Sequence, residues 1–226
     1  MGFSIPYVNS KYTGKEEPLN LPNNILDDGV YHGTMQDMHF EARHNVLERP
    51  FVATPYFGFS VPSHHYPTIG EAAVGPDLKQ YTTGIYIGRL LNPFLSRAFV
   101  HGSHAFTKVE KVLDLSLNRS NTEISVGYFL TPRLSTTFLW TKQWTHGGLG
   151  FSDMYSTTST DIFLQQDRLT KQSYQHLGVG MGVNLTESMS ASFSFRKFVS
   201  GVNAHYGEGF SGGLNWSFST SPQLFQ

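Results

Sequence analysis

The densest run of ionisable side chains is formed by Asp37, His39, Glu41 and Arg43, which alternate along one short stretch. In an extended strand, residues two apart point to the same face, so these four would form one polar ladder. Asp and His side chains can also catalyse hydrolysis. A hydrolytic site built on Asp37 and His39 would need a second acidic pair, which the sequence does not show. The ladder therefore predicts a polar surface or an ion-pair network, and no catalytic residue.

Two further patterns invite a catalytic or metal-binding interpretation. Gly209–Gly213 reads G-x-S-x-G, but a nucleophile elbow needs a strand-to-helix turn, and the residues that follow keep the period of a strand. The histidine pairs His64-His65 and His101 with His104 each offer two ligands, whereas a zinc site needs three or four. We predict no metal and no cofactor.

Composition narrows the class of protein further. The 226 residues carry 16 basic and 17 acidic side chains, 14% aromatics and no cysteine. A net charge of −1 gives no basic face for nucleic acid. Mean hydropathy is −0.25, and no segment approaches the roughly 18 apolar residues of a membrane helix. A β-barrel membrane protein is still compatible, because its strands alternate and dilute the hydropathy signal.

The clearest alternation lies in two adjacent segments, Leu177–Leu185 and Met189–Phe195. Their odd-numbered residues are apolar, and the even-numbered ones are small and almost uncharged. A half-exposed soluble sheet would carry charged residues on the second face, and these segments carry almost none. A soluble lipocalin-type barrel would need a polar exterior, and the apolar face of these segments argues against it. The pattern predicts a barrel with an apolar exterior, whose lumen holds Asn184, Arg196 and the polar ladder. A basic residue facing lipid instead would cost about 2–4 kcal/mol at the midplane.

Connections of two lengths alternate along the chain, as in outer-membrane barrels with short periplasmic turns and long extracellular loops. We predict an all-β, antiparallel up-and-down transmembrane barrel of about ten strands, and about twelve in a full-length relative. One strand is predicted over Gly33–Val46 and a short helix within Thr157–Lys171. The barrel domain spans residues 1–218, and residues 219–226 form a periplasmic tail. The short turns lie near 47–50, 91–94, 131–133 and 186–188, and the long connections near 10–28, 62–78, 108–120, 145–174 and 201–208.

Two lysines interrupt the apolar faces, Lys142 and Lys197, each eight residues beyond the first apolar residue after its turn. Both strands rise from periplasmic turns, so we expect the lysines at similar height near the outer membrane boundary. There a lysine stem lies along apolar surface while its ammonium group reaches water or lipid phosphate. Trp140 and Trp144 would join them in the aromatic girdle.

The last predicted strand fits a barrel-assembly signal through Gly213, Trp216 and Phe218. Glycine permits close backbone approach, and the two aromatics share one face. The expected partners are the barrel-assembly machinery, outer-membrane lipid and lipopolysaccharide. If an N-terminal hairpin is missing, either strand Phe3–Val8 pairs with Ser211–Phe218 and closes a smaller barrel, or the edge stays open.

Five stretches match motifs of one barrel family: Gly33–Asp37, Pro62–Thr68, Glu71–Gly75, Gly127–Leu134 and Thr145–Gly148. On these stretches the chain resembles the transporter-like outer-membrane barrels grouped with the phenol meta-pathway degradation (MetA-pathway) barrels, over nearly its whole length. The resemblance implies passage of small, often apolar molecules. Such relatives would carry a signal peptide and an earlier hairpin, whereas Met1 here leads directly into a strand. We therefore expect a mature or truncated form, or a misplaced start, of a bacterial outer-membrane protein.

Two functions remain open from the sequence. The first is a non-enzymatic channel for small hydrophobic or aromatic solutes. The second is a structural or adhesive barrel with a plugged lumen, whose long loops bind partners. Because eight strands enclose an interior just filled by side chains, a barrel of about ten leaves a narrow path, which is compatible with both.

Overall fold

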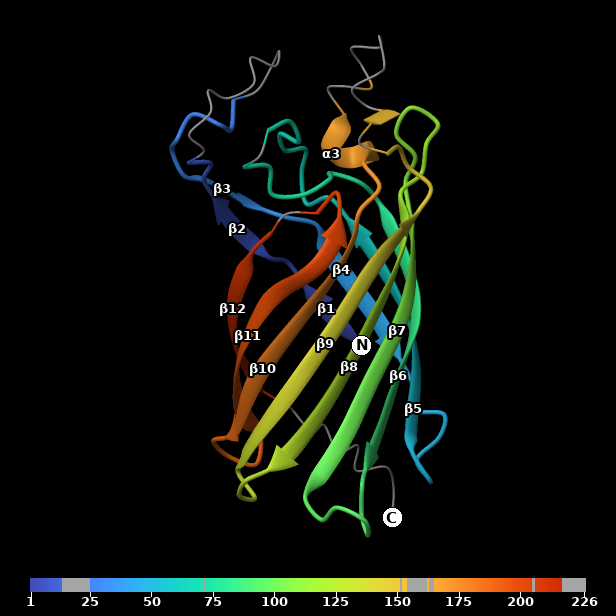
Figure 1. The fold of residues 1–226 in the computed structure, drawn as a ribbon, viewed down its shortest axis with the longest axis vertical. Coiled ribbons are helices and arrows are strands. Elements are labelled where there is room, and N and C mark those ends of the chain that lie inside the picture. The colour runs from blue at the N-terminus through green and yellow to red at the C-terminus, as the bar shows by residue number, and fades with distance from the viewer. Residues whose placement is uncertain are drawn as a thin grey trace, which may run out of the picture.

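The computed structural model describes residues 1–13, 25–70, 72–150, 152–153, 162, 165–204 and 206–216. Ten strands form one sheet in the order β1-β4-β5-β6-β7-β8-β9-β10-β11-β12, and β2 and β3 form a second, small sheet. Every strand pairing within the two sheets is antiparallel. The chain is an antiparallel up-and-down transmembrane β-barrel, as predicted (Figure 1).

From β4 onward each strand pairs with its neighbour in sequence. Short turns gather at one end of the barrel, and the long connections with α3 gather at the other, called the mouth below (Figure 1). Within the described residues, no helix is long and apolar enough to cross a membrane. The elements are β1 (Gly2–Ser4), β2 (Tyr7–Ser10), β3 (His32–Met35), β4 (Met38–Arg43), β5 (Val52–Val61), β6 (Gln80–Leu90), β7 (Ala98–Val109), β8 (Asn118–Phe129), β9 (Leu134–His146), α3 (Gln166–Leu169), β10 (Ser173–Asn184), β11 (Met189–Val202) and β12 (Glu208–Trp216).

The β10–β11 hairpin shows how alternation places the two faces. Val179 pairs with Phe195 and Met181 with Phe193, and these apolar side chains point outward. Val179 is 54% exposed, Met181 50% and Phe193 53%, because lipid, and not protein, covers this face. The glycines and serines between them face inward, as the sequence predicts.

The predicted strand Gly33–Val46 is instead two strands, β3 and β4, separated by Gln36 and Asp37. The break has a local cause. The backbone N–H of Gln36 donates to the Pro6 carbonyl at 2.8 Å, while β3 pairs with β2 and leaves the main sheet. Asp37 therefore lies just before the first residue of β4. The predicted connection 108–120 is also shorter, because β7 runs to Val109 and β8 begins at Asn118.

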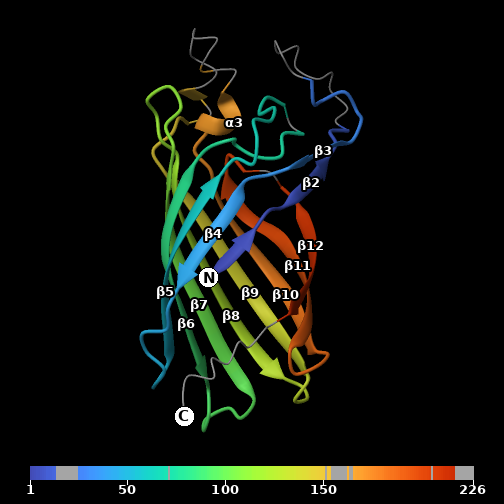
Figure 2. The same cartoon turned by 180° about the vertical axis from the view of Figure 1, so that it is seen from behind.

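The first and last described strands form the two edges of the large sheet. β1 pairs with β4, with Phe3 opposite Phe40, and β12 pairs with β11. Within the described ranges no residue of β1 pairs with β12, so the predicted pairing of Phe3–Val8 with Ser211–Phe218 is absent there. The N-terminus lies part-way along the wall (Figure 2). Phe218 and the predicted tail 219–226 lie outside the described residues.

The three most deeply buried apolar side chains, Leu169, Ala72 and Leu78, lie at the mouth. The loop between β5 and β6 crosses this end together with α3 (Figure 2). The predicted short helix is present as α3, and the rest of its predicted range is mostly outside the described residues. Segments far apart in sequence thus each bury an apolar side chain here: Leu26 (7% exposed), Tyr66 (6%), Ala72 (2%), Leu78 (5%) and Leu169 (1%).

Candidate solute path

A cavity of about 850 Å³ lies inside the barrel. We call it the lumen cavity. Its walls carry hydroxyl, amide, imidazole and charged side chains, as expected for the inner face of a transmembrane barrel. These include His39, Tyr56, Gln80, Tyr86, Arg119, Glu123, Gln143, Tyr174, His176 and Arg196.

Two smaller cavities adjoin the lumen cavity through shared wall residues. The mouth chamber, about 310 Å³, shares Arg119 and Gln143 with it. At the opposite end a foot cavity of about 620 Å³ shares Tyr86. The three cavities therefore follow one another from the mouth to the short-turn end, with Arg119, Gln143 and Tyr86 at the two junctions.

Three of the four predicted ladder residues, His39, Glu41 and Arg43, lie on β4 and form polar contacts there. His39 and Ser60 are hydrogen bonded, Nδ1 to Oγ, at 2.9 Å. Arg43 Nη1 lies 3.6 Å from Glu41 Oε1, and the Tyr86 hydroxyl donates to Glu41 at 3.4 Å. The register places these three ladder residues on the lumen side of β4, while Asp37 lies outside that strand.

Stacked tyrosines line the inner wall beside the ladder. The rings of Tyr56 and Tyr86 are 4.6 Å apart with an interplanar angle of 19°. A Cβ at Gly84 would meet the Tyr56 ring at 2.6 Å, so glycine leaves the space that the ring occupies. The sequence reasoning missed both tyrosines, although each lies on the alternating polar face of its strand.

One ion pair crosses the lumen. Arg196 Nη2 of β11 donates to Glu123 Oε2 of β8 at 3.2 Å. Two strands separate β8 from β11 in the sheet, so the bridge narrows the path instead of following the wall. Arg196 was predicted for the lumen and Glu123 was not, although Glu123 shares the polar face of β8 with Ser125 and Asn121.

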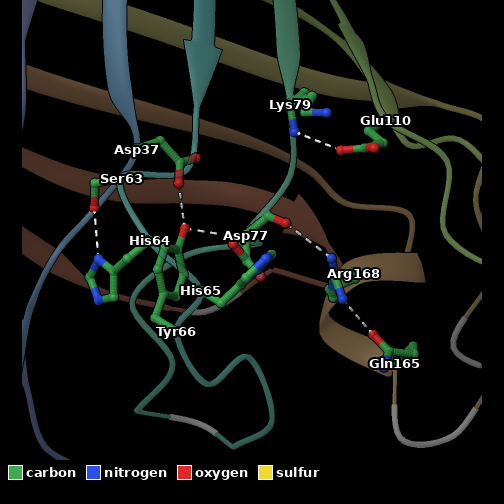
Figure 3. Close-up of polar contacts among 10 residues, drawn as sticks. All are labelled: Asp37, Ser63, His64, His65, Tyr66, Asp77, Lys79, Glu110, Gln165 and Arg168. Carbon is green, nitrogen blue, oxygen red and sulfur yellow. Dashed lines mark hydrogen bonds and ion pairs between the residues drawn. The ribbon is translucent and has the colours of Figure 1, made fainter.

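The mouth is held by hydrogen bonds around Tyr66 (Figure 3). Its hydroxyl donates to Asp37 Oδ1 at 2.6 Å and accepts from the Asp77 backbone N–H at 3.0 Å. Burial raises the pKa of the Asp37 carboxyl above its usual value, and the Tyr66 hydrogen bond opposes that shift. Burial and Asp37 both raise the pKa of Tyr66, so it stays a neutral donor. The predicted ladder residue Asp37 thus anchors the loop between β5 and β6.

Arg168 of α3 joins this network from the other side. Its Nη2 donates to the Asp77 carbonyl at 3.2 Å and its Nη1 to Gln165 Oε1 at 3.1 Å (Figure 3). The Asp77 carboxylate contacts His65 at 3.1 Å through Oδ2. Asp77 Oδ1 and Arg168 Nε are buried without a hydrogen-bond partner.

The predicted girdle residues lie as follows. Lys142 Nζ is 5.7 Å from the centre of the Trp144 ring, and Trp140 Nε1 donates to Gln175 Oε1 at 3.1 Å. Lys197 Nζ lies 3.1 Å from Glu208 Oε1. On β10, Lys142 is level with Gln175 and Lys197 with Leu177. Their common height in the membrane remains a prediction.

The other predicted residues lie near the short-turn end. Asn184 lines a cavity of about 390 Å³ beside the turn that contains Ser188, away from the lumen cavity. Gly213 pairs with Ser192 and Trp216 with Met189 in the β11–β12 pairing. These positions leave the assembly signal as a prediction.

The histidine pairs do not converge. His64 contacts Ser63 and Thr34, each at 2.9 Å. The register places His101 on the lumen side of β7 and His104 on the outer side. Among the described residues, no group of three or more His, Asp or Glu is arranged to hold a metal ion.

No protein-family model matches the chain, and no curated protein matches it. Among solved structures, the chain is similar to the crystal structure of an outer membrane channel from Pseudomonas putida F1, with a TM-score of 0.67 and 11% sequence identity. The match covers 95% of this chain and 74% of that one. At this identity the likeness establishes a shared outer-membrane barrel fold.

Proposed function

We propose that the protein is a non-enzymatic channel of the bacterial outer membrane through which small solutes cross. The observation that carries this proposal is the succession of three cavities from mouth to foot, joined by shared wall residues. The similar structure is also a channel in the same membrane.

The walls favour solutes that combine an aromatic or apolar body with a polar group. Stacked Tyr56 and Tyr86 offer ring faces, and aromatic pairs gain energy from offset stacking. Neighbouring hydroxyls and charged groups offer hydrogen bonds. The resemblance to the phenol meta-pathway barrels points to the same solute class, and grouping the chain with them is part of the proposal.

Conductance in planar bilayers tests the channel. The purified protein should give discrete steps, and Arg196→Ser should enlarge them because it removes the bridge to Glu123 across the lumen. Ser194→Ala, on the same strand and face, serves as the control. Silent bilayers after verified insertion, with the native protein and with Arg196→Ser, would overturn the channel.

The ladder should set the ionic preference of an open path, because charges in a narrow space of low dielectric act strongly. Arg43→Glu should shift the reversal potential under a salt gradient toward cations. An unchanged reversal potential at normal conductance would remove the ladder from the conducting path.

One observation favours the alternative of a plugged structural barrel. The loop between β5 and β6 is anchored across the mouth by Tyr66, which is only 6% exposed. In a plugged barrel, solute uptake into proteoliposomes would be absent and Tyr66→Phe would not restore it. A channel instead predicts uptake of benzenesulfonate, a charged aromatic solute that crosses bare lipid poorly, above the uptake by protein-free liposomes and above that of a sugar of similar size.

A further inference from the structure

The mouth chamber combines apolar walls with two guanidinium groups. Among the described residues that line it, Arg119 and Arg168 are charged and none is acidic. Both come from the mouth end of the molecule, Arg119 from the start of β8 and Arg168 from α3. The apolar part of the wall consists of Ala73, Val74, Pro76, Leu78, Val109 and Leu117.

Both arginines keep unused donors. A guanidinium group carries five N–H donors. Arg119 donates through Nη2 to Gln80, and Arg168 uses two donors, toward Gln165 and the Asp77 carbonyl. Within the described residues neither arginine lies in an ion pair. The chamber therefore carries positive charge that no carboxylate of the described residues neutralises through a direct contact.

We propose that the mouth chamber binds a small monocarboxylate with an apolar body, of the size of benzoate. A guanidinium fork matches a carboxylate through paired N–H···O bonds, and the apolar wall would cover the rest of the ligand. The volume of about 310 Å³ lies at the lower end of small-molecule sites. Arg119 also lines the lumen cavity, so the bound anion would lie at the entrance of that cavity. The binding of the anion stands by itself, whereas its movement onward through the lumen rests on the proposed function.

Calorimetric titration of the full chain in detergent micelles with benzoate tests the site. Arg119→Gln and Arg168→Gln should each weaken binding by about tenfold or more, as expected for a lost hydrogen bond to a charged group. Arg133→Gln, in an exposed turn at the opposite end, should leave it unchanged. Equal affinity of both chamber variants and the native protein would overturn the proposal, as would absence of binding to the native protein.

Two further comparisons guard against a folding defect. Benzamide has nearly the shape of benzoate without its charge, and should bind the native protein at least about tenfold more weakly. Arg168→Lys keeps the charge and should bind better than Arg168→Gln, but worse than the native protein, since lysine lacks the fork. Equal binding of benzoate and benzamide would overturn the proposal without any variant.

The failure of this inference is distinguishable from the failure of the channel. Benzoate binding in micelles together with silent bilayers would overturn only the channel. Conductance without benzoate binding would overturn only the anion site.

Discussion

The β10–β11 wall and the mouth are built on opposite rules. In the wall, apolar side chains alternate with small inward ones, and each strand pairs with its sequence neighbour over its length. At the mouth, Asp37 and the loop between β5 and β6, which carries Tyr66 and Asp77, meet through single hydrogen bonds. The wall repeats one arrangement many times, whereas every contact at the mouth occurs once.

This difference predicts where substitutions act. In the wall the decisive property of a residue is the face on which it lies, because lipid is on one side and a polar lumen on the other. At the mouth the decisive property is the individual donor or acceptor, because buried polar groups that lose a partner are costly. Function should therefore be more sensitive at the mouth, and membrane stability more sensitive in the wall.

The largest expected effect follows from placing one charge on either face of the wall. Val179→Arg faces lipid and should lower the free energy of unfolding from lipid by about 2–4 kcal/mol if it lies near the midplane. Ser192→Arg puts the same charge on the lumen side of the adjacent strand and should cost far less. Urea titrations of folding into vesicles measure both. Equal losses would contradict the assignment of faces.

The next effect tests a single contact at the mouth. Tyr66→Phe keeps the ring but removes the hydroxyl that joins Asp37 to the Asp77 backbone. We expect a local loss of about 1–3 kcal/mol, the usual cost of unsatisfied buried polar groups. Hydrogen exchange of the loop between β5 and β6 should accelerate, while β10 and β11 keep their protection. Tyr206→Phe, at an exposed tyrosine (71%), is the matched control.

The wall could be predicted from the sequence because strand period and turn length are local signals. The β10–β11 hairpin, the alternation of connection lengths and the antiparallel sheet all follow from them. The split between β3 and β4 could not be predicted in this way, since it depends on the Pro6 carbonyl and on Tyr66. Both act on Gln36 and Asp37 from elsewhere in the chain, and alternation continues through the break.

The candidate path was predictable only in part, for the same reason. His39, Glu41 and Arg196 lie on alternating polar faces, and the same rule applied throughout would have included Glu123 and Tyr86. Arg168 carries no such signal. It lies in a helix of four residues, and its place at the mouth chamber depends on how a long connection folds over the barrel.

A smaller effect at the mouth depends on pH. Burial raises the pKa of Asp37 above its ordinary value, and repulsion from Asp77 adds to this shift, while the Tyr66 hydrogen bond and Arg119 oppose it. A raised carboxyl pKa means that its contribution to stability is complete below the unfolded pKa and is lost as pH rises through the folded one. Loop protection, corrected for intrinsic exchange, should therefore fall as the pH rises above the ordinary aspartate pKa of about 4. Asp37→Asn should flatten this dependence, and a slope of opposite sign would exclude Asp37 as its source.

The smallest effect belongs to the outer face of the wall, at Lys197. Its ammonium group lies 3.1 Å from Glu208, with the two side chains 50% and 47% exposed. An exposed ion pair contributes little to stability because solvent screens it, so Glu208→Gln should scarcely change folding into neutral vesicles. If Lys197 lies at the outer boundary, its partner there is also lipid phosphate, and Lys197→Met should weaken folding into anionic vesicles more than into neutral ones. Lys108→Met, at a position that the register places outward near the mouth end of β7, provides the comparison. An identical response of Lys197→Met in both lipids would show that Glu208 alone holds this lysine, and the girdle would then have to rest on Trp140, Lys142 and Trp144.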